Sequence, residues 1–214
     1  MAIICPSITA TNLEDYEKQI KKVSHYAHRI HIDLSDGQFA PVKLLSASEA
    51  WWPAMVKADF HLMDKLPATA VSTVLRHRPH MVIIHAEADG NFEVFARHCH
   101  ERKVKVGVAL LQSTPAETII PALELIDHVL IFSGDLGKYG GHADLKLLDK
   151  IATLKQHKPD LEIGWDGGVN EQNVAQLILG GVDVLNVGGF IQNAEDANEA
   201  IGRLQRIADE TGTT

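Results

Sequence analysis

Two side chains that can bind a metal or carry a proton stand close together early in the chain. His31 and Asp33 lie in the stretch RIHIDLSDGQFAP, residues 29–41. In a β-strand, residues two apart point to the same face, so an extended segment places both side chains together. The turn formers Ser35, Asp36 and Gly37 end this strand, which puts the pair at its carboxyl end. Ligands of α/β proteins bind at that end, although a structural pair in a barrel interior is the alternative.

Polar residues also end several of the other apolar runs. They are Ser7, His61, His85 and Asp166. Two imidazoles and two carboxylates, from His31, Asp33, His61 and Asp166, suit one divalent ion of Zn, Fe, Mn or Co better than Ca or Mg. Taken alone, His61 could equally be an ordinary strand histidine, and Asp166 could simply cap the turn that follows it. We expect a metal site because all four residues obey the same positional rule.

Glycine pairs form the second pattern with chemical meaning. Gly167-Gly168 opens a helical segment, and Gly188-Gly189 follows the last apolar run. Backbone amides free of side chains, beside a helix amino terminus, suit an anion such as a phosphate. The alternative is a purely structural role, in which these glycines only form tight turns. A longer glycine-rich segment, residues 134–142, includes Gly140 and Gly141, and it suits either a lid over the substrate or a mobile surface loop.

The elements that must position these residues alternate without interruption. Short runs rich in Val and Ile predict strands at 2–7, 29–34, 58–63, 81–86, 105–110, 128–133, 161–165 and 184–187. Segments of helical period predict helices at 12–24, 46–56, 68–76, 92–102, from 115, 145–157, 172–179 and 194–209. Eight such units predict an α/β fold, a single (β/α)8 TIM barrel over residues 1–214, with an open doubly wound sheet as the alternative. Active sites in these barrels lie at the carboxyl ends of the strands.

Composition limits the partners and the cellular location. The chain has 214 residues, 45% of them apolar and 22% charged, as in ordinary soluble domains. The net charge of −8 and the scattered basic residues argue against nucleic acid, and no segment predicts a signal peptide or a membrane span. The isolated Cys5 and Cys99 are expected to be free thiols. We therefore expect a cytoplasmic protein that acts on a small molecule.

These motifs resemble the ribulose-phosphate 3-epimerase family over nearly the whole chain. CPSITA is similar to the family's opening PSI segment, HIDLSDGQFAP to its HIDVMDGHFVP, FHLM to its HLM, IIHAEA to its HxEA, and WDGGVN to its VDGGVN, in the same order. The resemblance implies a (β/α)8 barrel that interconverts ribulose 5-phosphate and xylulose 5-phosphate at carbon 3. We also expect a homo-oligomer.

The resemblance assigns the metal to His31, Asp33, His61 and Asp166, and both acid-base roles to Asp33 and Asp166. Inversion at carbon 3 removes a proton next to the ketone and returns one on the opposite face, so two carboxylates can each serve one face. The substrate contacts it implies are Ser7, His61, Gly140, Gly141, Gly168, Gly188 and Gly189. For His85 the resemblance leaves open a partner of the site or a packed strand histidine.

Departures from the family pattern fall on substrate contacts. Ser35 replaces a methionine, residues 135–142 differ from the family's NPGFGGQ lid, and Gly188-Gly189 replaces a glycine-serine pair. The sugar could therefore be a hexulose 6-phosphate instead, or the chain could bind a phosphosugar without turnover. An aldol or decarboxylation reaction is disfavoured, because HIDLSD lacks the lysine of the DxKxxD motif in such barrels.

Overall fold

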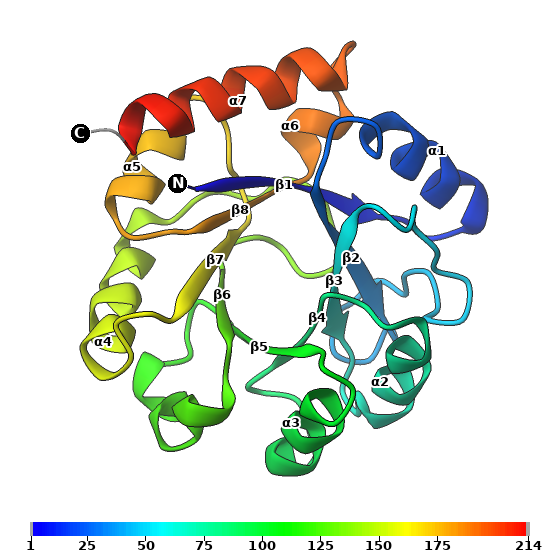
Figure 1. Cartoon of the computed structure of the whole chain (residues 1–214), viewed down its shortest axis with the longest axis vertical. Helices are drawn as coiled ribbons and strands as arrows, with labels where there is room; N and C mark the ends of the chain where they lie inside the picture. Colours follow the sequence, from blue (N-terminus) through cyan, green and yellow to red (C-terminus); the bar gives the residue numbers. More distant parts are fainter. Residues whose placement is uncertain (1, 213–214) are drawn as a thin grey trace.

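Eight parallel strands close into a barrel in the computed structural model, which describes residues 2–212. Each strand pairs with its neighbours in chain order, and β8 pairs back to β1 (Figure 1). The strands are β1 (Ile3–Thr9), β2 (Arg29–Ser35), β3 (Lys57–Met63), β4 (Met81–His85), β5 (Lys105–Leu110), β6 (His128–Phe132), β7 (Glu162–Asp166) and β8 (Val184–Val187). The predicted (β/α)8 class is confirmed, and the open sheet is excluded.

Helices surround the barrel and form its outer layer (Figure 1). The α-helices are α1 (Leu13–Val23), α2 (Ala68–Val74), α3 (Phe92–His100), α4 (Asp149–His157), α5 (Val174–Leu179), α6 (Gly189–Gln192) and α7 (Ala197–Thr211). The 3-10 helices are η1 (Leu75–His77), η2 (Ala116–Leu125) and η3 (Leu145–Leu148). Side-chain caps set several starts, as where Asn12 accepts from the backbone N–H of Asp15 before α1.

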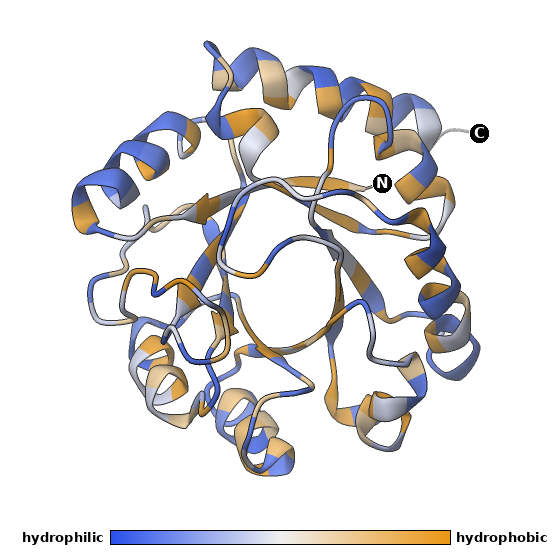
Figure 2. Ribbon diagram, turned by 180° about the vertical axis from the view of Figure 1, so that it is seen from behind, coloured by the Kyte–Doolittle hydropathy of each residue, from blue (hydrophilic) through white to orange (hydrophobic). Residues whose placement is uncertain are grey.

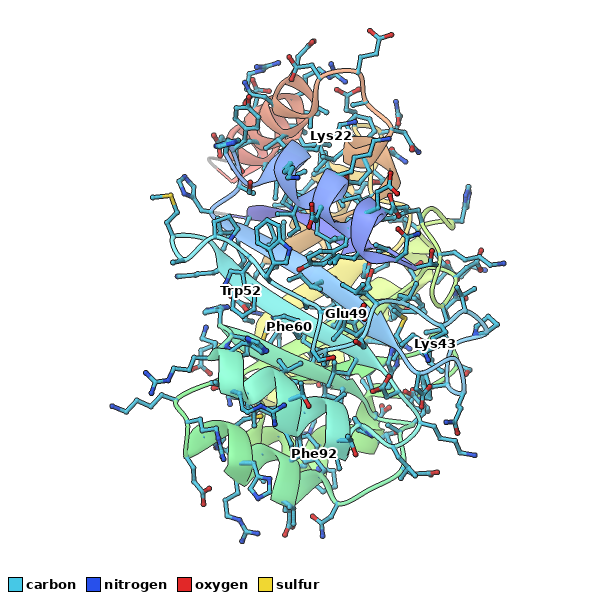
Figure 3. The ribbon with its side chains drawn as sticks, turned by 90° about the vertical axis from the view of Figure 1, so that its right-hand side faces the viewer. Lys22, Lys43, Glu49, Trp52, Phe60 and Phe92 are labelled. Carbon is cyan, nitrogen blue, oxygen red and sulfur yellow. The ribbon has the colours of Figure 1, made fainter. Side chains whose placement is uncertain are left out.

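The predicted helix over residues 46–56 is wrong, because the structure has turns and irregular backbone there. Pro53 lacks a donor and disfavours helical geometry in the residue before it. The Ser46 hydroxyl donates to the Glu49 carboxylate at 2.5 Å, a local bond that competes with a helix. Trp52 packs edge-on against Phe60 of β3, with ring centres 5.3 Å apart (Figure 3).

Two other helices differ from their predicted form. The helix after Pro115 is the 3-10 helix η2, and Pro121 inside it cannot donate to the backbone. The helix predicted over residues 194–209 is α7, Ala197–Thr211, and the short helix α6 that precedes it was not predicted. Asp196 begins α7 by accepting a hydrogen bond from the backbone N–H of Glu199 at 3.0 Å.

The strands bury both of their faces. Outward residues such as Ile30 and Ile32 join the large core between barrel and helices, whereas the alternate residues fill the interior. Met81, Ile83, Ala109 and Leu130 form a separate buried cluster. Many strand segments are mainly hydrophobic (orange), and the surrounding helices contain both hydrophobic and hydrophilic (blue) residues (Figure 2). Polar inward side chains thus occupy the two ends of the barrel, above and below an apolar middle.

Over residues 2–212, the structure contains no helix with the length and apolar character that a membrane crossing requires.

Candidate active site

The four predicted ligands meet at the carboxyl end of the barrel. His31 and Asp33 come from β2, His61 from β3 and Asp166 from the last position of β7. One ligand atom from each lies within 4.8 Å of the others. His31 Nε2 is 3.2 Å from an Asp33 oxygen and 3.6 Å from Asp166, and His61 Nδ1 is 3.0 Å and 3.9 Å from the same two carboxylates. Strand alternation and barrel closure therefore bring together residues that lie far apart in the sequence.

These separations fit a single divalent ion. Bonds of about 2.0–2.1 Å to a tetrahedral ion imply ligand atoms roughly 3.4 Å apart. Within residues 2–212, the ion pairs of Asp33 and Asp166 are all with histidines. Neither ring nitrogen of the buried His31 has a hydrogen-bond partner within residues 2–212, so a bound ion would displace no hydrogen bond of this ring. Two imidazoles and two carboxylates without a lysine or arginine partner are a donor set for Zn, Fe, Mn or Co.

The environment of Asp33 favours its charged form. Burial would raise the pKa of this carboxyl, but the close approach and charge of His31 and His61 outweigh burial and lower the pKa well below its ordinary range. The hydroxyl of Thr9 donates to the second Asp33 oxygen at 2.5 Å. Asp33 is thus an oriented carboxylate with one oxygen directed at the cluster.

Asp166 has the opposite tendency. Burial and the neighbouring charge of Asp33 raise its pKa to about 7, against the opposing effect of His31. Two carboxylates that share one site cannot both ionise easily without a nearby cation. The pair therefore contains one strong and one weak acid, an arrangement that enzymes use for acid-base catalysis.

A small cavity of about 60 Å³ opens beside the carboxylates. Most of the predicted substrate contacts line it: Ser7, Gly140, Gly168, Gly188 and Gly189, together with Asp33 and Asp166. His61 and Gly141 are not among the lining residues. The Ser7 hydroxyl has no partner in the described part of the chain, and it is Thr9 that bonds Asp33.

The glycine loops pack closely over this cavity. Gly168 has a φ of +69°, and a Cβ there would lie 2.4 Å from the backbone nitrogen of Ala143. Its N–H donates to the carbonyl of Gly140 at 3.1 Å. A Cβ at Gly188 would lie 2.4 Å from the Tyr139 ring. Glycine is required at both positions because the segment 134–142 closes down on the loops after β7 and β8.

Tyr139 fastens that segment to β1. Its hydroxyl accepts a hydrogen bond from the backbone N–H of Thr9 at 2.7 Å and contacts the side-chain oxygen of Gln19. Gln19 in turn bonds both the N–H and the carbonyl of Thr9. The segment 134–142 therefore covers the cavity, and Tyr139 ties it to β1.

Sequence reasoning missed several cavity residues. Thr9, Met63, Phe132, Tyr139 and Asn186 line the cavity. Asn186 is buried on β8 opposite Asp166, and its side-chain oxygen has no partner among residues 2–212. Strand alternation could have found Thr9, two residues after Ser7, and the polar residue within VLNV could have indicated Asn186. His85, which the sequence left open as a partner of the site or a packed strand histidine, lies 2.9 Å from His61, nitrogen to nitrogen.

Comparisons with known proteins agree with this geometry. The model described as "Ribulose-phosphate 3 epimerase family" matches residues 3–192. A protein of Schizosaccharomyces pombe named ribulose-phosphate 3-epimerase is 28% identical over 217 residues, covering 95% of this chain and 92% of its own. The protein of that name from Bacillus subtilis is 29% identical over 215 residues, covering 96% of this chain and 99% of its own.

Solved structures share the fold at lower identity. A crystal structure of 3-hexulose-6-phosphate synthase has a TM-score of 0.73 and 16% identity, covering 96% of this chain and 99% of its own. A crystal structure of KGPDC from Streptococcus mutans has a TM-score of 0.72 and 10% identity, covering 99% of each chain. The family match and the full-length relatives decide the assignment and confirm the predicted isomerase class. The chain belongs to the ribulose-phosphate 3-epimerase family.

Proposed function

We propose that this chain epimerises a phosphorylated ketose at carbon 3, with ribulose 5-phosphate and xylulose 5-phosphate as the favoured pair. The observation that carries the proposal is the meeting of Asp33 and Asp166 beside one cavity. They come from β2 and β7, which are separated around the barrel by β1 and β8. Carboxylates from two separated strands can reach opposite faces of one substrate carbon, as inversion requires. The names of the curated relatives support the same substrate.

Asp33 and Asp166 exchange the protons in this proposal. One carboxylate removes the proton from carbon 3, which leaves an enediolate, and the other acid returns a proton to the opposite face. Thr9 keeps Asp33 in orientation through its hydrogen bond. His31, Asp33, His61 and Asp166 would hold one divalent ion, whose contribution is Lewis-acid stabilisation of negative charge on the substrate oxygens.

The remaining cavity residues bind and enclose the sugar phosphate. We assign Gly168, Gly188 and Gly189 to the phosphate, with Gly140 and Gly141 contributing from the lid. Ser7 offers the substrate a hydroxyl that has no partner among residues 2–212, and Phe132 and Met63 supply apolar walls that exclude water. The cytosolic location and the homo-oligomeric state stay predictions from the sequence.

The deciding experiment uses ribulose 5-phosphate in deuterated water. The protein is freed of metal with a chelator, loaded separately with Zn²⁺, Mn²⁺, Co²⁺ or Fe²⁺, and carbon 3 is followed by NMR. We expect metal-dependent formation of xylulose 5-phosphate that carries deuterium at carbon 3. The matched control is Asp166→Asn, which should not accumulate this product.

A different ketose phosphate is the second candidate, because Asn186 adds an amide to the cavity wall beside Asp166. Turnover of a hexulose 6-phosphate, with ribulose 5-phosphate unchanged, would favour that substrate. A folded, metal-loaded protein that binds phosphosugars and exchanges no proton would instead show that turnover has been lost.

A further inference from the structure

Asn186 is a buried polar residue that has no part in the proton transfer. It lies on β8, is 2% exposed and lines the cavity beside the carboxylates. Its side-chain oxygen, Oδ1, has no hydrogen-bond partner within residues 2–212. A buried carbonyl oxygen without a partner costs free energy, because it has lost its hydrogen bonds to water and gained none in return. This oxygen therefore calls for a hydrogen-bond donor that enters the cavity.

The fold does not require an amide at this position. The backbone of Asn186 pairs with Cys5 on β1 and with Asp166 on β7, so β8 is held between its two neighbours. The other three residues of β8 are buried and apolar. Asparagine is depleted in strands, and an apolar side chain would fill the barrel interior at least as well. A residue that breaks the local pattern in this way is typical of a functional site.

A second polar group without a partner lies on the neighbouring strand. The Ser7 hydroxyl on β1 lines the same cavity and, like Asn186 Oδ1, has no partner in the described part of the chain. The Thr9 hydroxyl, in contrast, donates its hydrogen bond to Asp33. Because β8 and β1 lie between the strands that carry Asp166 and Asp33, these two groups form a polar wall between the two acids. A substrate held between the acids therefore lies along this wall.

The chemistry of Oδ1 limits what it can bind. A carbonyl oxygen accepts hydrogen bonds and donates none, so its partner must carry a hydrogen. An ionised phosphate group offers acceptor oxygens, which suit the backbone N–H groups of the glycine loops instead. The hydroxyl groups of a sugar can donate. We therefore expect Asn186 Oδ1 to meet a hydroxyl of the sugar and not its phosphate.

The position of Asn186 indicates which hydroxyl it meets. In the proposed reaction, Asp33 and Asp166 act on carbon 3, and Gly188 binds the phosphate. Asn186 is level with Asp166 across the β7–β8 pair, and it precedes Gly188 by two residues, or about 7 Å of extended chain. In ribulose 5-phosphate, carbon 4 lies between carbon 3 and the carbon that bears the phosphate. Its hydroxyl is thus the donor that comes closest to Asn186 when both ends of the substrate are held.

We propose that Asn186 is a specificity residue whose side-chain oxygen accepts a hydrogen bond from the carbon 4 hydroxyl of the ketose phosphate. This inference rests on the proposed epimerase function and adds a contact to its substrate site. A buried acceptor that depends on a substrate hydroxyl discriminates against a sugar without that hydroxyl, because the acceptor then stays unpaired. The contact therefore helps to select the sugar, while the two acids carry the protons.

A sugar without this hydroxyl is the direct probe. The metal-loaded protein is given ribulose 5-phosphate or its 4-deoxy analogue, and kcat/KM for epimerisation of each is measured by NMR. We expect the wild type to prefer ribulose 5-phosphate by about 10–100-fold. Asn186→Leu keeps a side chain of similar shape and removes the acceptor. It should lose about that factor with ribulose 5-phosphate and almost nothing with the analogue, so the preference should nearly disappear.

Val184→Ala is the matched control. Val184 lies two residues before Asn186 on β8, so it points to the same face, and it is buried at 1% exposure. It is not among the residues that line the cavity. The smaller side chain should lower the unfolding temperature through lost packing and leave the preference between the two sugars unchanged. A preference that falls equally in both variants would show that it reports the integrity of β8, and this result would overturn the inference.

A second measurement does not depend on turnover. Without ligand, Asn186→Leu should unfold at or above the wild-type temperature, because a buried acceptor without a partner is removed. Asn186→Ala, which adds no bulk, should show the same loss of preference between the sugars. Equal losses of kcat/KM with both sugars, or a selective loss of inhibition by inorganic phosphate, would overturn the inference while the epimerase function stood. A wild type that epimerises neither sugar would overturn the proposed function and this inference with it.

Discussion

The two ends of the barrel interior contain similar residues in opposite electrostatic states. At the amino end, Arg29 donates to Asp59 at 2.5 Å and to both oxygens of Glu162 at 3.0 and 2.8 Å. His128 adds a contact of 2.8 Å to Glu162. At the carboxyl end, two carboxylates and two histidines converge with no such cation among residues 2–212. At the amino end an arginine pairs with the buried carboxylates, whereas the ion pairs of Asp33 and Asp166 within residues 2–212 are with histidines.

The difference shows how one fold separates stability from function. Burial would raise the pKa of Glu162, but His128 and Arg29 outweigh it and lower that pKa well below its ordinary range. The comparable carboxyl at the other end, Asp166, has its pKa raised to about 7. A buried carboxylate whose pKa is lowered stabilises the fold above its unfolded pKa, whereas one whose pKa is raised costs stability when it ionises.

The largest expected effect is on catalysis at the carboxyl end. Asp33→Asn or Asp166→Asn removes a proton carrier and should lower epimerisation by about 10²–10⁴-fold, measured as kcat with ribulose 5-phosphate. Metal-free Asp166→Asn should unfold at or above the wild-type temperature, because a neutral amide replaces a disfavoured charge. Near-normal turnover in either variant would refute the assignment of two acids.

At the amino end, removing a charge should damage the fold instead. Arg29→Met leaves Asp59 and Glu162 buried without their cation and should cost about 3–5 kcal/mol of unfolding free energy in urea. Lys21→Met is the surface control, because Lys21 pairs with Glu17 at 69% and 41% side-chain exposure. That change should stay within about 0.5 kcal/mol. Equal losses in both variants would show that the network contributes no more than a surface pair.

The pH dependence of stability should carry the signature of Asp166. Its folded pKa of about 7 exceeds the unfolded value of about 3.9, so the folded state binds more protons between these limits. This residue's contribution to stability is therefore present below pH 4 and is lost as the pH rises through 7. We expect a loss on the order of 4 kcal/mol across this window in chelator-treated protein.

Subtracting a variant isolates that contribution. Burial lowers the pKa of His61 to about 3, with His85 and His31 adding to the effect against Asp33, and this produces the opposite slope over an overlapping range. The difference between wild type and Asp166→Asn removes such shared terms. A difference that does not change between pH 4 and pH 7 would show that Asp166 is ionised in the folded protein throughout.

Patterns of period two and 3.6 predicted the barrel and the four converging ligands, because strand alternation and the carboxyl-end rule are local properties. The sequence did not predict the Arg29 network, because its members lie on β2, β3, β6 and β7 and meet only through barrel closure. The carboxyl-end rule placed His85 and His61 at the same end of the barrel, but it did not predict their direct contact. The helix over residues 46–56 was wrongly predicted from the spacing of apolar residues. Pro53 and local side-chain hydrogen bonds determine the backbone conformation there.

The smallest expected effect concerns the lid, which covers only the carboxyl end. Tyr139→Phe removes the hydroxyl that contacts Thr9 and Gln19, but the Thr9 N–H keeps its 3.0 Å bond to Gln19. No buried donor is left unpaired, so the free energy of lid closure should become less favourable by about 1 kcal/mol, which lowers the closure equilibrium constant roughly fivefold. We expect KM for ribulose 5-phosphate to rise two- to fivefold with Zn²⁺ affinity unchanged, since the hydroxyl contacts no ligand. A matching loss of Zn²⁺ affinity would instead show that the lid supports the metal site directly.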